Sequence, residues 1–321
     1  MTNETIENSA QPYDFETAFK TANSLINNLS TVIFGANKAI RASVLACLSG
    51  KHLLLEDTPG VGKTVLAKAM AHSLGVKASR IQGQPDLLPS DITGFSIYRQ
   101  ELGKFEFQPG PIFSQIVLCD ELNRTPPRTQ AALLETMEEK QVTVDGTTHT
   151  LPEPHLIVAT QNPISQYGTF PLVESQVDRF GIATSLGYPK FDEEVQLMLN
   201  GASDTKASSI EQITTPEGWR TLKEITSKVQ VSEKIADYVV RIISLTRNFN
   251  GIKLGASPRA GLSLLEVCRA EALIQGRTYI IPDDVLNCLE LSIGHRLVLE
   301  PGIKVNEILW SLIQRVNTPL P

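Results

Sequence analysis

The sequence predicts an α/β protein, with an N-terminal layered domain built on a mainly parallel sheet and a C-terminal helical domain. Short apolar runs that suit buried strands alternate with helical stretches in the first part of the chain. A glycine-rich segment joins the first of these runs to a helix, and the strand-like runs stop after about residue 189. At 321 residues the chain is long enough for two domains.

Apolar spacing gives the expected elements in order. Buried strands are expected at 53–56, 80–82, 116–120 and 156–160. Helices of the first domain are expected at 14–29, 38–48, 64–74 and 128–140. Helices of the second domain are expected at 219–229, 233–248, 258–275, 282–291 and 305–316. Two hairpins interrupt the alternation, at 95–107 and 141–151, and Asp145-Gly146 suits a tight turn in the second.

Composition suggests the domain limits. Residues 1–12 are polar and predict a disordered tail. Residues 13–192 form the expected α/β domain, and residues 211–321 form the expected helical domain. Between them, residues 193–210 are expected to be a linker, because they include a run of small and polar residues.

Charge and cysteine content exclude several classes of protein. The net charge of −6 argues against a general nucleic-acid binder, which is more often basic. The four cysteines are too few and too scattered for a disulfide framework or a zinc ribbon. The first residues do not resemble a signal peptide, and no apolar run reaches the length of a membrane helix. We therefore expect a cytoplasmic protein that binds neither nucleic acid nor membrane.

The glycine-rich segment predicts a phosphate-binding loop. It follows an expected strand and opens an expected helix, which is the context that such a loop requires. Its residues are expected to bind ATP, and they are Pro59, Gly60, Val61, Gly62, Lys63, Thr64 and Val65. Backbone N–H groups would face the phosphates, Lys63 would add a positive charge, and Thr64 would offer a hydroxyl to Mg²⁺. Asp57 stands where the pattern expects glycine, and we expect its carboxylate to point away from the phosphates.

Two carboxylates follow another buried strand. Placed beside the strand of the phosphate loop, Asp120 could hold Mg²⁺ and Glu121 could orient the attacking water. Asn162 follows the next strand and could reach between the two motifs. Alone, each of these patterns has an ordinary structural explanation, an acidic turn for the first and an Asn-Pro turn for the second.

Together these segments resemble the AAA+ ATPases, and more closely their MoxR family. The shared segments are the phosphate loop, Asp120-Glu121, Gln161-Asn162-Pro163, Asp178-Arg179-Phe180 and Ser257-Pro258-Arg259. The stretches similar to MoxR proteins are 84–94, 110–113, 120–135, 142–144 and 169–174. The similarity covers about residues 30–316.

The resemblance implies an AAA+ αβα domain with a mainly parallel five-stranded sheet, a C-terminal all-helical lid, and rings, usually homo-hexamers, that bind ATP between subunits. It implies that Asn162 is sensor 1, Arg179 is the arginine finger that reaches a neighbour's ATP, and Arg259 is the sensor-2 arginine. The segment matching the lining of the adenine pocket is Val32, Ile33, Phe34 and Gly35. The hairpin at 95–107 resembles the insert that projects toward the centre of the ring in this group, and the hairpin at 141–151 is similar to the one that precedes sensor 1.

The favoured interpretation is a Mg²⁺-dependent ATPase of the MoxR type that remodels client proteins or helps them to mature. The resemblance implies a separate partner with a von Willebrand factor A domain, because no such domain fits within this chain. Three alternatives were considered: a metal-insertion motor like the ATPase subunit of magnesium chelatase, a nucleic-acid motor, and a nucleotide-gated scaffold. The MoxR-like stretches argue against the first, the acidic charge argues against the second, and the presence of Glu121 and Arg179 argues against the third.

Overall fold

The computed structural model describes residues 14–58, 60–162, 168–200, 207 and 210–319. The expected tail at 1–12 and the loop residue Pro59 lie outside the described residues. Within the described part, no helix has both the length and the apolar composition that a membrane crossing requires.

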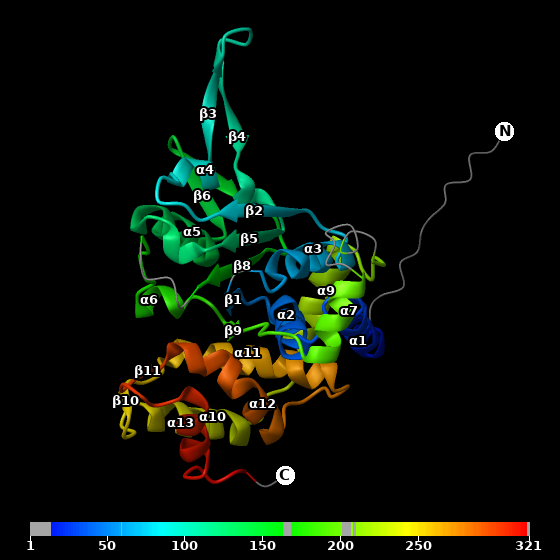
Figure 1. The fold of residues 1–321 in the computed structure, drawn as a ribbon, viewed down its shortest axis with the longest axis vertical. Coiled ribbons are helices and arrows are strands. Elements are labelled where there is room, and N and C mark those ends of the chain that lie inside the picture. Colours follow the sequence, from blue (N-terminus) through cyan, green and yellow to red (C-terminus); the bar gives the residue numbers. More distant parts are fainter. Residues whose placement is uncertain (1–13, 59, 163–167, 201–206, 208–209, 320–321) are drawn as a thin grey trace, which may run out of the picture.

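A five-stranded sheet forms the centre of the first part of the chain (Figure 1). Its strands are β1 (Leu53–Glu56), β2 (Ala78–Gln82), β5 (Ile116–Asp120), β8 (Leu156–Gln161) and β9 (Ile182–Thr184), in the order β2-β5-β8-β1-β9. Every pairing is parallel, which confirms the expected sheet. One expectation is wrong: the strand of Asp120 is not beside the strand of the phosphate loop, because β8 lies between them.

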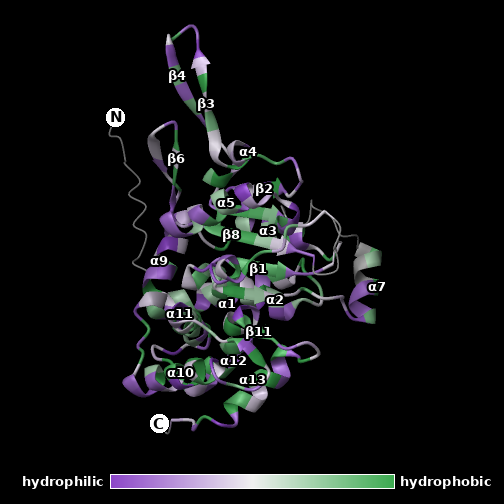
Figure 2. Cartoon of the chain, turned by 90° about the vertical axis from the view of Figure 1, so that its left-hand side faces the viewer, coloured by the Kyte–Doolittle hydropathy of each residue, from purple (hydrophilic) through white to green (hydrophobic). Residues whose placement is uncertain are grey.

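Helices cover both faces of this sheet. Successive side chains of a strand point to opposite faces, so Leu53 and Leu55 enter one core cluster while Leu54 enters the other. The first cluster includes α1 (Phe15–Ser30), α2 (Asn37–Ser49) and α3 (Lys63–Ser73). The second includes α4 (Pro89–Thr93) and α5 (Pro127–Glu139). The result is an αβα sandwich, and Figure 2 shows the apolar strands β1 and β8 between the helices.

Two hairpins stand outside the sheet, as predicted. They are β3 (Gly94–Arg99) with β4 (Lys104–Pro109), and β6 (Gln141–Val144) with β7 (Thr147–Thr150). Asp145 and Gly146 have φ of 50° and 78°, the left-handed conformation that a tight hairpin turn needs. Figures 1 and 2 show the β3–β4 hairpin extending away from the sheet. The Phe107 ring stacks on His149, with centroids 3.9 Å apart, so the base of one hairpin rests on the other.

The last part of the chain is mainly helical. Its helices are α9 (Pro216–Ser227), α10 (Glu233–Thr246), α11 (Pro258–Ile274), α12 (Pro282–Ile293) and α13 (Val305–Ile313). The expectation of an all-helical lid is wrong in one detail, because β10 (Ile252–Leu254) and β11 (Val298–Leu299) form a short antiparallel pair. Segments of three and two residues are too short to show a strand period in the sequence. The helices α6 (Glu174–Val177) and α7 (Phe191–Asn200) were not predicted, and α7 covers residues 193–200 of the expected linker. The 3₁₀ turns Pro111–Phe113, Leu122–Arg124 and Gly294–Arg296 were not predicted either.

The helical part packs directly on the first two helices of the chain. The Trp219 indole on α9 is buried and donates to the Cys47 carbonyl oxygen on α2 at 3.0 Å. Arg41 on α2 forms an ion pair with the buried Glu271 on α11. One continuous core cluster therefore joins the sheet to the lid through α1 and α2.

Candidate active site

The loop between β1 and α3 has the backbone that a phosphate site requires. Gly60 and Gly62 have φ of 87° and 99°, a region that glycine adopts at little cost. Gly62 is the N-cap of α3 and no side chain caps this helix. A helix N-terminus without a side-chain cap presents free N–H groups to an anion. No described atom lies within 4 Å of the place where a Gly60 side chain would begin, so the loop is open there.

Asp57 ties the loop to the segment that follows β9. Its carboxylate oxygens accept the backbone N–H groups of Leu186 at 2.5 Å and Gly187 at 3.2 Å. The Asp57 carbonyl accepts the Lys63 ammonium at 3.0 Å. Both carboxylate oxygens are therefore directed at this backbone, in agreement with the expectation that they do not face the phosphates. Asp57 is buried, and it holds the loop in place of the usual glycine.

The end of β5 carries Asp120 in a network with its neighbours. Thr160 on β8 is fully buried, and its hydroxyl donates to Asp120 Oδ1 at 2.7 Å. The same hydroxyl oxygen accepts the backbone N–H of Glu121 at 2.9 Å. Arg80 on β2 forms an ion pair with Asp120 Oδ2 at 2.7 Å. Neither Thr160 nor Arg80 was predicted from the sequence, although a hydroxyl inside an apolar strand is a visible signal.

Glu121 is held in an unusual backbone conformation. Its φ of 54° is left-handed, which costs energy for a side chain with a Cβ atom. Its Oε2 atom accepts from Gln82 Nε2 at 3.3 Å and from Arg124 Nη1 at 3.2 Å. Only glycine fits at position 83, because a Cβ atom there would lie 2.1 Å from the Glu121 carbonyl oxygen. These contacts hold the Glu121 side chain at the edge of the sheet where β5 ends.

The carboxyl edge of the sheet collects the predicted phosphate and metal residues. Thr64 follows β1, Asp120 ends β5, and Asn162 follows β8, which lies between them. The Asn162 carbonyl accepts Asn123 Nδ2 at 3.2 Å. Hydroxyl and carboxylate oxygens are the donors that Mg²⁺ prefers, so the residues at this edge fit the ion.

The predicted adenine segment reaches the same edge through residues 186–193. Ile33 is buried, Val32 and Phe34 are partly buried, and Gly35 has a φ of 74°. A Cβ atom on Gly35 would lie 3.0 Å from the Pro189 Cα atom. The Thr58 hydroxyl of the phosphate loop donates to the Tyr188 hydroxyl at 3.1 Å. One segment after β9 therefore contacts both the adenine segment and the phosphate loop.

Arg179 and Arg259 lie together, but not at this edge. Both form ion pairs with Glu138, Arg179 at 3.1 Å and Arg259 at its other oxygen. Arg179 also donates to the Leu134 carbonyl at 2.6 Å. Arg179 precedes β9 and Glu138 lies at the end of α5, so both belong to the amino edge of the parallel sheet. A strand of four residues such as β1 separates the two edges by about 13 Å.

Arg296 of the lid binds the turn that carries Arg179. Arg296 is buried and forms an ion pair with Asp178 at 2.9 Å. Its Nη2 donates to the carbonyl oxygens of Asp178 and Phe180, both at 2.9 Å. Burial lowers the pKa of Arg296 to about 10, so the group remains charged at neutral pH. Sequence reasoning missed Arg296 and Glu138, because no local pattern marks them as partners of the two arginines.

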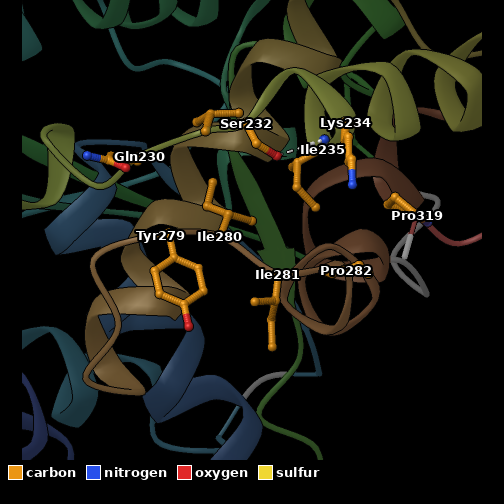
Figure 3. A pocket seen from close by; sticks show the side chains of 10 residues that line it. Gln230, Ser232, Lys234, Ile235, Tyr279, Ile280, Ile281, Pro282 and Pro319 are labelled. Atoms are coloured by element: carbon orange, nitrogen blue, oxygen red, sulfur yellow. Dashed lines mark hydrogen bonds between the residues drawn. The ribbon is translucent and has the colours of Figure 1, made fainter. Parts of the chain in front are cut away.

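A separate cavity opens within the lid. It has a volume of about 700 Å³ and lies between the start of α10 and the segment before α12. Figure 3 shows Ile235, Ile280 and Ile281 around it, with the Ser232 hydroxyl bonded to the Ile235 N–H at 3.3 Å. None of the residues predicted for catalysis lines this cavity, so it is not the site of the predicted chemistry.

Comparison with known proteins places the chain in a family. Residues 52–182 match the model of the ATPase family associated with various cellular activities (AAA), and residues 244–309 match the AAA lid domain. The chain is 38% identical to the chaperone MoxR1 of Mycobacterium tuberculosis, over 91% of this chain and 82% of that protein. The chain belongs to the MoxR family of AAA+ ATPases.

Two further matches extend over almost the full length of this MoxR protein. It is 40% identical to the uncharacterised protein YeaC of Bacillus subtilis, over 92% of this chain and 94% of that one. A crystal structure of a proposed ATPase from Cytophaga hutchinsonii matches with a TM-score of 0.88 and 33% identity, covering 95% of this chain and 97% of that one. The matches agree with the AAA+ α/β fold and the helical lid seen in the structure. Membership of the family also implies ATP hydrolysis.

Proposed function

We propose that this protein is a Mg²⁺-dependent ATPase that works as a ring and remodels client proteins or helps them to mature. One observation carries the proposal. The phosphate loop and the two carboxylates are at the carboxyl edge of the sheet, while Arg179 and Arg259 are at the amino edge. Each chain thus offers two halves of a site that only a neighbouring copy can complete.

At the carboxyl edge the chain's own residues bind and orient. The loop N–H groups and Lys63 bind the β- and γ-phosphates, and Asn162 contacts the γ-phosphate from β8. When bound, Mg²⁺ would neutralise phosphate charge, with Thr64 and Asp120 as its protein ligands. Glu121 accepts a hydrogen bond from the attacking water and directs it at the γ-phosphate. Its contacts with Gln82 and Arg124 restrict the carboxylate to this side of the site.

At the amino edge the two arginines act on the ATP of the next subunit. A guanidinium that enters a site from a neighbour stabilises the charge of the transition state. Glu138 holds both guanidinium groups in the single chain, so it must release at least one when the ring closes around ATP. We propose a homo-hexamer, with hydrolysis coupled to movement of the lid through Arg296.

The wider role follows from the relatives. One relative is named as a chaperone, which supports protein clients for this chain as well. We propose that a separate protein with a von Willebrand factor A domain delivers or selects these clients.

The test compares Glu121→Gln with the matched change Glu224→Gln, which alters an exposed glutamate on α9. Glu121→Gln should bind ATP with near-normal affinity but release phosphate about 10² to 10⁴ times more slowly, the usual contribution of a positioned base. Glu224→Gln should behave as wild type. Phosphate release, binding of a fluorescent ATP analogue and mass in solution are measured with and without Mg²⁺. Normal turnover in Glu121→Gln would refute the assigned role.

A further inference from the structure

A second cavity opens at the amino edge of the sheet, away from the phosphate loop. Its volume is about 310 Å³, and its lining is rich in cationic and imidazole groups. The polar and charged side chains include Lys51, His52, Lys140, Glu153, His155 and Lys223. Arg179 borders it as well. These residues come from the starts of β1 and β8, the end of α5, and α9.

Two of the lysines form no direct ion pair with any residue that the structure describes. Lys140 is paired with Glu153 at 2.8 Å, and Arg179 is paired with Glu138 at 3.1 Å. Among the described residues, no carboxylate lies within 4 Å of the Lys51 or Lys223 ammonium group, although Glu266 acts on Lys51 and Glu153 acts on Lys223 from farther away. Both are partly buried, and burial lowers the pKa of each ammonium group below its usual value. Partly buried cations without a partner are costly unless an anion joins them.

Two glycines make room for these lysines. A Cβ atom on Gly50 would lie 2.8 Å from Lys223 Cε, so the tip of Lys223 passes over the glycine backbone. A Cβ atom on Gly181 would lie 2.6 Å from Lys51 Cγ. Each lysine side chain therefore passes close over a glycine, where a larger residue would collide with it.

The histidines have defined hydrogen-bond roles. His52 Nδ1 accepts the Ile157 N–H at 3.0 Å. His155 Nδ1 lies 2.9 Å from the Ser114 carbonyl, so it carries the hydrogen and donates it. The other nitrogen, His155 Nε2, must then be an acceptor. It is buried and has no partner among the described residues, and the ring lines the cavity.

We propose that this cavity binds a compact oxyanion of the phosphate class, such as inorganic phosphate or pyrophosphate. Lys51 and Lys223 donate to its oxygens, and His155 Nε2 accepts the acidic hydroxyl that a phosphate keeps near neutral pH. Sulfate has the same shape but no such hydroxyl, so the site distinguishes the two ions. The volume suits one or two phosphate groups and not a whole nucleotide. Because the cavity borders Arg179, its occupant lies beside the residue that serves the neighbouring ATP site.

The test titrates pyrophosphate into the full chain by calorimetry, with the phosphate loop saturated by ADP. Lys51→Gln and Lys223→Gln should each weaken binding about tenfold or more, since each removes a charge-assisted hydrogen bond. Lys253→Gln, which changes an exposed lysine on β10, is the matched control and should bind as wild type. Absence of saturable binding, or equal binding by all variants, would overturn the proposal.

Folding is checked by thermal unfolding of the same variants. Pyrophosphate should raise the unfolding temperature of wild type and Lys253→Gln but not of Lys51→Gln or Lys223→Gln, because a ligand stabilises only the state that binds it.

A second arm compares phosphate with sulfate. Wild type should bind phosphate about tenfold or more tightly than sulfate, since sulfate leaves His155 Nε2 unpartnered. His155→Phe should lose this preference. Equal affinities of wild type for the two ions would refute the assignment to the phosphate class.

Discussion

The two edges of the central sheet carry different halves of the proposed site. The carboxyl edge has the glycine loop, Asp120, Glu121 and Asn162, each at the end of a strand or directly after it. The amino edge has two arginines joined by one glutamate, and beside them a cavity with two lysines that form no direct ion pair among the described residues. The first edge is assembled from short local motifs, and the second from segments that are far apart in the sequence.

The difference has a mechanical consequence. Since all five strands are parallel, a residue before a strand and a residue after it are separated by the length of the strand. One subunit cannot bring Arg179 to its own phosphate loop without breaking the sheet. The proposed function therefore requires contact between subunits, and we expect assembly to control hydrolysis.

The largest expected effect comes from mixing variants that are defective at opposite edges. Arg179→Ala should lose about 10³-fold or more in turnover, as expected for an arginine finger. Glu121→Gln should be inactive too, but mixed rings should regain activity, because some interfaces then combine an intact Glu121 with a neighbour's intact Arg179. Phosphate release is measured over a range of mixing ratios.

The control for this experiment is Arg241→Ala, which removes an exposed arginine that is paired with Asp237 on α10. It should retain wild-type turnover. If the mixture releases phosphate no faster than the two variants do when measured separately and added, the two edges do not cooperate between subunits.

A smaller effect is expected at Asp57, which holds the phosphate loop to the segment after β9. Asp57→Gly restores the usual loop pattern but leaves the buried Leu186 N–H without its acceptor. The free energy of unfolding should fall by about 1–3 kcal/mol, the cost of an unpaired buried group. Asp57→Asn keeps one acceptor oxygen, so its free energy of unfolding should lie between those of wild type and Asp57→Gly. Urea unfolding measures the series, and a glycine variant as stable as wild type would remove the structural role of Asp57.

The sequence predicted most of the fold because its signals are local. The apolar runs at 53–56, 116–120 and 156–160 lead into the phosphate loop, Asp120-Glu121 and Asn162, so strand and motif support each other. The order of the strands was not predictable, since Asp120 and the phosphate loop carry no mark of the strand between them. The β10–β11 pair was missed because so short a segment has no period.

The contacts at the amino edge could not be predicted from the sequence, for a different reason. Glu138, Arg296 and the lysines around the second cavity come from distant segments and become neighbours only after folding. His155 lies partly buried beside His52, and no local pattern in the sequence marks it. Long-range convergence of single residues leaves no pattern that spacing could detect.

The smallest expected effect tests this buried histidine pair through pH. Burial lowers the pKa of His155 to about 4 and that of His52 to about 3, whereas an unfolded histidine has a pKa near about 6.5. Lys51 and Lys223, the cations close to the pair, also oppose protonation of His52, and Lys223 opposes that of His155. The folded state therefore keeps both rings neutral. Their contribution to stability is complete above pH 6.5 and is lost as the pH falls toward the folded pKa.

At one pH unit below the unfolded pKa, His155 should account for a loss of about 1.4 kcal/mol in the free energy of unfolding. Urea unfolding at pH 7.5 and 5.5 measures the loss, and His155→Phe should reduce it by that amount. His72→Phe changes an exposed histidine on α3 and should keep the full loss. An equal pH dependence in all three proteins would mean that His155 is not held neutral at the amino edge.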